Sequence, residues 1–180
     1  MNKQTQTGFT LIELVVVIVL LGLLAATALP RFLDVTDQAQ SAAVEGVAGG
    51  FATGVSLVKA QWVADGNSSG TGDIEVVLDG VSFFANENGW PANTTLGLST
   101  DLNNQTAAEC LQVWNAVLQN PPRATAGTID DDDKYSVGVI TSNPDQCTYT
   151  LVVNGALDPQ GRMFTYNLST GSVTVQLTTP

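Results

Sequence analysis

One acidic residue near the amino terminus requires a chemical explanation. Glu13 is the single charged residue in a largely apolar run from Phe9 to Leu29. A carboxylate inside an apolar membrane helix costs about 2.5 to 3.5 kcal/mol on insertion scales. A positive charge nearby would offset this cost, because opposite charges attract strongly where the dielectric constant is low. Glu13 therefore predicts a cationic partner, with the alternative that it lies one turn from the membrane surface and reaches the lipid headgroups.

The two cysteines are the next residues with chemistry of their own. The chain has two cysteines, Cys110 and Cys147, and its amino terminus predicts export. An even number of cysteines in an exported chain predicts a disulfide, and two separate buried thiols are the alternative. Closing this loop would stabilise the fold by about 4 kcal/mol on the chain-entropy account. The sequence has no histidine and no third cysteine, which excludes a zinc site of the usual kind.

A run of acids offers the only metal chemistry that the sequence suggests. Asp130 to Asp133 are four consecutive aspartates, followed by Lys134. Like charges at this spacing repel one another, so a solvated loop is the first interpretation. A calcium site is the alternative, with Asp131 and Asp133 as candidate ligands and Asp145 or Asp158 as further oxygen donors.

Charge and composition exclude several function classes. Seventeen acidic residues against six basic ones give a formal net charge of -11, and the six cations are scattered along the chain. Nucleic acid is therefore not an expected partner, because phosphate binding requires clustered Lys and Arg. There is no histidine, neither cysteine has a base partner, and no glycine-rich phosphate loop or paired-acid motif is present, so we expect neither catalysis nor a cofactor.

The elements that carry these residues begin with one long helix. The run from Phe9 to Leu29 spans about 32 Å as a helix, enough to cross a bilayer core. A secretory signal would be cut after this run, where residues 25–29 are an imperfect match, and a plain anchor is a further alternative. Pro30 and Gly22 predict a kink. Beyond them the apolar face continues at helical spacing through Val35, Ala39, Ala43, Val47, Phe51, Val55, Val58 and Trp62.

Glycines at positions 46, 50 and 54 lie four residues apart on this helix. Such spacing permits close backbone approach, and packing in the protein's own core is the preferred interpretation over a dimer motif. After Trp62 the composition turns polar, which predicts that the helix ends there. Asp79-Gly80 between two apolar runs predicts a hairpin with a type I' turn.

The remaining sequence predicts a short helix and several strands. Thr106 and Glu109 match a capping box, so a helix should follow, with Leu111, Trp114 and Leu118 on one face. Alternating runs then predict strands over residues 135–140, 147–153, 163–168 and 172–177. Together these elements predict an α+β fold in which an antiparallel sheet packs against the long helix.

The string Gly8-Phe9-Thr10-Leu11-Ile12-Glu13-Leu14 resembles the processing signal of type IV pilins and of the pseudopilins of type II secretion. The resemblance implies that a prepilin peptidase cuts after Gly8 and that the new terminal Phe9 is methylated. It also implies that Glu13 guides assembly, and the amine created at Phe9 of a neighbouring subunit would be its cationic partner. The implied parts are a cleaved leader over 1–8, a membrane and filament-core helix over 9–30, and a globular domain over 31–180 that includes the second half of the long helix.

More loosely, the chain resembles the mannose-sensitive haemagglutinin pilins, a type IVa group. The segments that carry this resemblance are Gly8 to Arg31, Asn88-Gly89-Trp90-Pro91, Glu109 to Trp114, Phe164 to Asn167 and Thr170-Gly171. The resemblance implies a type IV pilin fold with a disulfide loop in its carboxyl-terminal part. It implies a structural subunit of a surface filament used for attachment and biofilm formation. A minor pilin of the same pilus and a type II secretion pseudopilin are the alternatives.

The same resemblance implies partners and a location. The partners would be further copies of the chain, other pilins, the prepilin peptidase, the pilus assembly machinery and, more weakly, host or surface glycans. The precursor would reside in the inner membrane before it enters an extracellular pilus.

Overall fold

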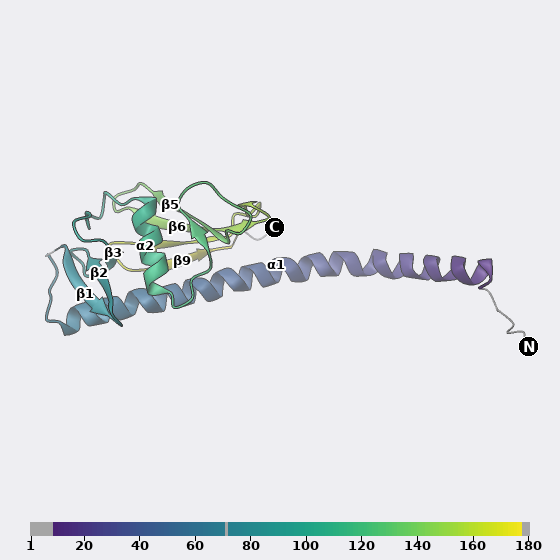
Figure 1. The fold of residues 1–180 in the computed structure, drawn as a ribbon, viewed down its shortest axis with the longest axis horizontal. Coiled ribbons are helices and arrows are strands. Elements are labelled where there is room, and N and C mark those ends of the chain that lie inside the picture. The colour runs from purple at the N-terminus through teal and green to yellow at the C-terminus, as the bar shows by residue number, and fades with distance from the viewer. Residues whose placement is uncertain (1–8, 71, 178–180) are drawn as a thin grey trace, which may run out of the picture. The chain divides into compact units, whose positions relative to one another are not determined.

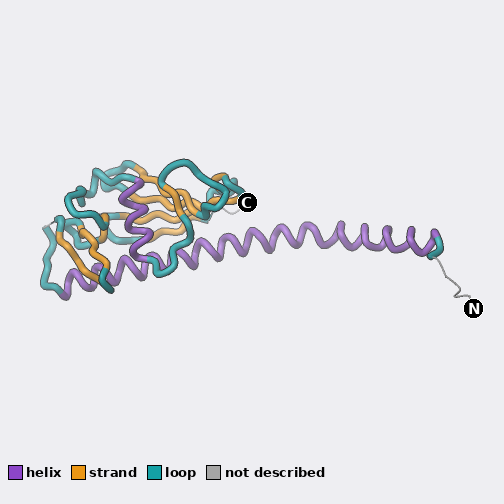
Figure 2. Tube along the Cα trace, in the orientation of Figure 1, coloured by secondary structure: helices purple, strands orange, loops and turns teal. Residues whose placement is uncertain are grey.

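The computed structural model describes residues 9–70 and 72–177, and only the backbone of residues 30 and 32–34. The chain forms two compact units, residues 1–40 and residues 41–180. Figures 1 and 2 show one long helix followed by a second, shorter helix and a set of strands. In chain order the elements are α1 (Leu11–Ala64), β1 (Ile74–Leu78), β2 (Val81–Ala85), β3 (Pro91–Asn93), α2 (Ala107–Val117), β4 (Ala124–Thr125), β5 (Tyr135–Ile140), β6 (Gln146–Val153), β7 (Ala156–Leu157), β8 (Met163–Asn167) and β9 (Val173–Gln176).

The first unit contains the amino-terminal part of α1. The helix is continuous from Leu11 to Ala64 and passes through both Gly22 and Pro30. Proline removes one backbone donor, but a helix can continue past it when the neighbouring turns hold. The kink at these two residues therefore stays a prediction, whereas the predicted end of the helix just after Trp62 is confirmed.

The second unit holds two sheets where the sequence predicted one. The smaller sheet has the order β1-β2-β3 and is antiparallel. Its hairpin turns at Asp79 and Gly80, whose φ angles are 50° and 81°. Positive φ at both central residues is what a type I' turn requires, so the predicted hairpin is confirmed.

The larger sheet has the order β4-β5-β6-β8-β9, with β7 pairing to β6. The β5-β6, β6-β8 and β8-β9 pairs are antiparallel, whereas the short β4 runs parallel to β5. The four long strands correspond to the four alternating runs of the sequence. The two-residue strands β4 and β7 carry too little alternation for a sequence pattern to reveal them.

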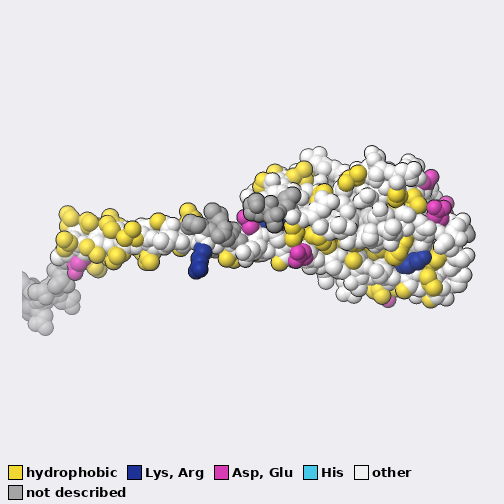
Figure 3. All heavy atoms as spheres, turned by 180° about the vertical axis from the view of Figure 1, so that it is seen from behind, with side chains coloured by type: hydrophobic (Ala, Val, Ile, Leu, Met, Phe, Trp, Pro, Cys, Tyr) yellow, Lys and Arg dark blue, Asp and Glu magenta, His cyan; other side chains and the backbone are white. Residues whose placement is uncertain are grey.

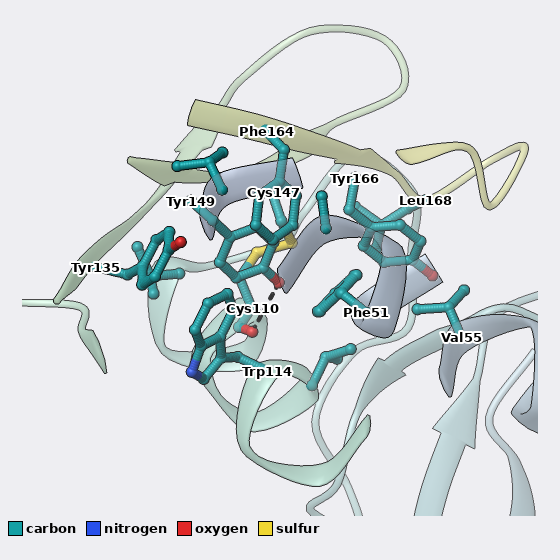
Figure 4. Close-up of a cluster of buried hydrophobic side chains, with 14 of the residues drawn as sticks. Phe51, Val55, Cys110, Trp114, Tyr135, Cys147, Tyr149, Phe164, Tyr166 and Leu168 are labelled. Atoms are coloured by element: carbon teal, nitrogen blue, oxygen red, sulfur yellow. Dashed lines mark hydrogen bonds between the residues drawn. A yellow bond between two sulfur atoms is a disulfide. The ribbon is translucent and has the colours of Figure 1, made fainter. Parts of the chain in front are cut away.

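Aromatic rings form the centre of the core between α1, α2 and the larger sheet (Figure 4). Phe51 of α1 lies 5.0 Å from Tyr149 and 5.5 Å from Phe164, measured between ring centroids. Trp114 of α2 stacks on Tyr149 at 5.1 Å. Ring pairs at these separations contribute about 0.5 to 1.5 kcal/mol each beyond the area that they bury. The carboxyl-terminal half of α1 thus packs on the sheet, as predicted.

The disulfide lies inside this core. Cys110 of α2 is bonded to Cys147 of β6, and both residues are buried. The hydroxyl of Tyr149 donates a hydrogen bond of 3.0 Å to the carbonyl oxygen of Cys110 (Figure 4). The disulfide therefore links α2 to β6, the central strand of the larger sheet.

The capping box at the start of α2 is present, with Thr106 as the N-cap and Glu109 as its partner. The predicted apolar face of α2 is confirmed in part, because Trp114 is fully buried and Leu111 and Leu118 pack against the core. Cys110, Val113 and Trp114 are buried, whereas Leu111 and Leu118 are only partly buried. The sequence interpretation missed Cys110 and Val113 as the buried neighbours of Trp114.

Candidate functional site

The amino-terminal part of α1 presents a long apolar surface. Leu11–Leu29 has a mean hydropathy of 2.7, and none of it is buried by the rest of the chain. Figure 3 shows hydrophobic side chains covering this part of the helix. Nineteen residues are enough to cross a membrane core. A second stretch, Val35–Ala64, passes the same length and composition test, but a third of it is buried and it contributes Phe51 to the core.

Glu13 lies in the first turn of α1, where it closes a capping box. Thr10 precedes the helix, and its backbone N–H and its hydroxyl donate hydrogen bonds of 2.9 Å and 2.7 Å to Oε2 of Glu13. In return, the N–H of Glu13 donates to Oγ1 of Thr10 at 3.3 Å. The arrangement satisfies backbone donors that the first turn of a helix leaves free, and it resembles the cap of α2.

The sequence interpretation missed this local role of Glu13. The signal was present, because Thr10-Leu11-Ile12-Glu13 has the same spacing as the Thr106 to Glu109 cap that was recognised. The cap gives the carboxylate two donors, which lowers the cost of placing it in an apolar run. Neither donor carries a positive charge, so the cap does not replace a cationic partner.

The predicted cleavage site and methylation site stand directly before this cap. Gly8 lies outside the described residues, and Phe9 is exposed two residues before the start of α1. An amine created at Phe9 would lie next to the positive end of the helix dipole, where a cation is unfavourable and a carboxylate is favourable. A nearby carboxylate would stabilise such an amine, and Glu13 supplies a carboxylate at that end of the helix.

The acidic run at residues 130–133 is organised around an arginine. Arg123 forms ion pairs with Asp133 at 3.0 Å, Asp132 at 3.4 Å and Asp130 at 3.5 Å. Asp133 is buried, and its second oxygen accepts a hydrogen bond from the N–H of Asp130 at 2.9 Å. The sequence interpretation missed Arg123, which is seven or more residues away from the run and gave no local signal.

The acids proposed as calcium ligands do not converge. Asp145 accepts hydrogen bonds from the backbone N–H groups of Gln105 and Ser142. Asp158 binds Arg162 through two ion-paired contacts of 2.8 Å, and both side chains are buried. Hydrogen bonding from Arg162 lowers the pKa of Asp158. Within residues 9–70 and 72–177 no three His, Cys, Asp or Glu residues form a group that could hold a metal ion, so Asp131 and Asp133 are not joined by a third carboxylate.

Comparison with known proteins connects the amino-terminal region to a processing motif. Residues 3–29 match the family description "Prokaryotic N-terminal methylation motif". The major component of a type IV narrow pilus from Thermus thermophilus is 38% identical over 103 residues, which cover 57% of this chain and 77% of that protein. The chain belongs to the type IV pilin family. The predicted family and fold class are thereby confirmed, and this pilin is a filament subunit.

Other relatives of the pilin support the same assignment. A type IV major pilin protein of Neisseria gonorrhoeae is 34% identical over 114 residues, covering 61% of this chain and 68% of that protein. A type II secretion system core protein G of Pseudomonas aeruginosa is 39% identical over 59 residues, covering 33% of this chain and 42% of that protein. No solved structure matches the chain significantly. These relatives are structural subunits, so the pilin is not an enzyme, as predicted.

Proposed function

We propose that this pilin is the structural subunit of a type IVa pilus that serves attachment and biofilm formation, as its resemblance to mannose-sensitive haemagglutinin pilins implies. The observation that carries the proposal is the exposed apolar segment Leu11–Leu29 with Glu13 in its first turn. Many copies of such a segment can bury one another in a shared filament core, and the apolar area removed from water stabilises the polymer.

The same proposal assigns a role to each amino-terminal residue. A prepilin peptidase cuts the inner-membrane precursor after Gly8 and removes the leader over 1–8. Phe9 then becomes the methylated amino terminus, and its charged amine pairs with Glu13 of an adjacent subunit. The helix over 9–30 serves first as the membrane anchor and then as the filament core, and residues 31–180 form the globular domain on the outside of the pilus. Other pilins and the pilus assembly machinery are the partners.

A pseudopilin of type II secretion is the second candidate, because a type II secretion core protein is among the relatives. The buried Cys110–Cys147 disulfide favours a pilin, since major pseudopilins usually rely on calcium for the same structural purpose. Electron microscopy of the producing cells separates the two. Long surface fibres containing this chain support the pilus, and their absence from cells that make the mature protein supports the pseudopilin.

The proposed processing is tested by intact mass measurement and amino-terminal analysis of the chain in sheared surface filaments. We expect a chain that starts at Phe9 and carries one added methyl group. A chain that starts at Met1 has no free amine at Phe9, and a chain cut beyond Leu29 lacks both Phe9 and Glu13. Either result would overturn the proposed pairing.

A further inference from the structure

One arginine stands at the carboxyl-terminal end of the apolar segment of α1. Arg31 follows Leu11–Leu29 by two residues, and its side chain is exposed. It forms no ion pair with any residue that the structure describes. The other two arginines of the chain, Arg123 and Arg162, are both paired with aspartates. Within the described residues Arg31 is therefore the one guanidinium that still needs an anionic partner.

The depth of Arg31 in the membrane indicates which anion is available. If Leu11–Leu29 spans the inner membrane in the precursor, as proposed, Arg31 lies among the lipid headgroups on the outer side. Every phospholipid headgroup carries a phosphate, and a guanidinium binds phosphate through two parallel charge-assisted hydrogen bonds. The positive charges that orient a membrane protein lie on the cytoplasmic side, so Arg31 does not serve that purpose. Phosphate is the abundant anion at this depth.

A shallow hollow beside Arg31 has room for another part of a lipid. It has a volume of about 640 Å³ and is lined by Thr27, Ala28, Arg31 and Val35 of α1. Thr27 and Ala28 lie about one turn before Arg31, on the same face of the helix. The hydroxyl of Thr27 donates a hydrogen bond of 3.0 Å to the carbonyl oxygen of Leu24, so it needs no partner in the hollow. An acyl chain can therefore lie along this face while its phosphate contacts Arg31.

The spacing along α1 relates Arg31 to Glu13. The 18 positions between them span about 27 Å in an α-helix, and the hydrocarbon core is about 30 Å thick. With Arg31 at the outer phosphates, Glu13 lies within one turn of the cytoplasmic edge of the core. Arg31 also ends the apolar run, because the sequence continues with Phe32 and Leu33 before the next charged residue, Asp34. Without Arg31 the apolar run would extend to residue 33, and the helix could slide outward through the bilayer.

We propose that Arg31 binds the phosphate of a phospholipid in the outer leaflet of the inner membrane and so fixes the depth of the chain before assembly. The inference rests on the membrane anchor of the proposed function and adds to it a lipid ligand and a residue that sets the depth. A fixed depth keeps Glu13 near the cytoplasmic edge, where a carboxylate costs less than at the centre of the bilayer.

Solid-state NMR of the full-length chain in vesicles tests the contact. The vesicles contain phosphatidylethanolamine and phosphatidylglycerol in phosphate-free buffer, so all phosphorus belongs to lipid. Dephasing of carbon-13-labelled guanidinium groups by phosphorus measures the distance between them. We expect one arginine within about 5 Å of phosphorus, as paired hydrogen bonds to phosphate require. Arg31→Lys should abolish the signal, whereas Arg123→Lys, the matched control at a side chain that is 55% exposed, should keep it.

A thiol near the cytoplasmic end of the helix tests the effect on depth. Leu14→Cys is labelled with an impermeant maleimide in inside-out inner-membrane vesicles, where both native cysteines are held in the disulfide. Adding Arg31→Leu should move position 14 and speed its labelling by at least about fivefold if the helix slides toward the cytoplasm, or slow it by as much if the helix slides outward, since only a thiolate in contact with water reacts. Adding Arg31→Lys should leave the rate unchanged.

Three results would overturn the proposal. They are the absence of any phosphorus signal, a signal that survives Arg31→Lys, and a labelling rate at position 14 that is the same with and without Arg31→Leu. Failure of the proposed function is recognised separately. Release of the wild-type chain from the vesicles by an alkaline carbonate wash would contradict the membrane anchor itself, and with it the lipid contact.

Discussion

Asp158 and Arg162 form the most deeply buried ion pair among the described residues. The side chains are 0% and 2% exposed, and the carboxylate accepts two hydrogen bonds from the guanidinium and one from the N–H of Arg162. A pair of this kind adds little net stability over an apolar pair of the same shape, but removing one partner leaves a buried charge uncompensated. Removing the Asp158 carboxylate would take these three hydrogen bonds away from Arg162.

We therefore predict that Asp158→Ala destabilises the pilin by about 3 to 5 kcal/mol and lowers its Tm by roughly 10 °C. Asp132→Ala is the matched control, because Asp132 also pairs with an arginine but is 84% exposed, and its removal should change stability by less than about 1 kcal/mol. Thermal unfolding of the detergent-solubilised chain, followed by near-ultraviolet circular dichroism, measures both. Equal losses of stability in the two variants would show that burial is not the reason for the loss in Asp158→Ala.

The same pair predicts a pH dependence. Its hydrogen bonds lower the folded pKa of Asp158 below the usual value of about 3.9. A lowered folded pKa contributes stability above the unfolded pKa, and this contribution is lost as the pH falls through the folded value. The stability difference between wild type and Asp158→Ala should stay constant from pH 7 to about pH 5 and shrink below about pH 4. A difference that grew on acidification would contradict this sign.

Gly171 shows how one backbone position sets the packing around a turn. Its φ is +70°, and a Cβ atom there would overlap the ring of Trp90. Gly161 has a similar φ of +66° but faces open space. Gly161→Ala should lower the free energy of unfolding by about 1 to 2 kcal/mol, because alanine is strained at positive φ. Gly171→Ala should lose the same amount from strain and about 1 to 3 kcal/mol more from overpacking against the Trp90 ring. Urea unfolding of both variants measures the difference, and equal losses would show that the ring contact is unimportant.

At the scale of elements, the contact between α1 and α2 can be tested with two glycine substitutions that should change the free energy of unfolding in opposite directions. Gly46 and Gly54 are both helical, but a Cβ at Gly46 meets nothing within 4 Å, whereas one at Gly54 overlaps the backbone of Val117. Gly46→Ala should stabilise by about 0.5 to 1 kcal/mol, because alanine loses less backbone entropy in a helix. Gly54→Ala should destabilise by about 1 to 3 kcal/mol through overpacking. Unfolding of the detergent-solubilised chain in urea measures both, and a loss at both positions would contradict the contact.

The elements also show which parts of the fold a sequence can predict. The Asp79-Gly80 turn and the Thr106 cap were predictable, because both depend on residues within a few positions of one another. The division into two sheets was not, since strand pairing is decided by contacts far apart in the chain. Burial of Trp114 on α2 was predictable from helical spacing, whereas the burial of Cys110 beside it goes with its bond to Cys147 in a strand far along the chain.

The candidate site residues follow the same rule. Glu13 was recognisable because an acid is rare in an apolar helix, and its neighbour Thr10 could have been recognised by its spacing. Arg123 could not, because its aspartate partners belong to a separate segment and are brought to it by the fold.

At the scale of the whole molecule, the observed cap and the proposed charge pairing of Glu13 predict different outcomes for assembly. Glu13→Gln keeps the hydrogen bonds of the capping box but removes the charge, whereas Thr10→Ala weakens the cap and keeps the charge. If the carboxylate pairs with the amine of a neighbouring Phe9, Glu13→Gln and Glu13→Ala should both lower filament yield by about tenfold or more, since losing one partner of a buried charge pair costs about 2 to 5 kcal/mol. Thr10→Ala should assemble nearly normally.

Immunogold electron microscopy with quantified sheared filaments measures the yield. Normal assembly of Glu13→Gln together with failure of Thr10→Ala would show instead that Glu13 acts through its cap, and the charge pairing between subunits would have to be abandoned.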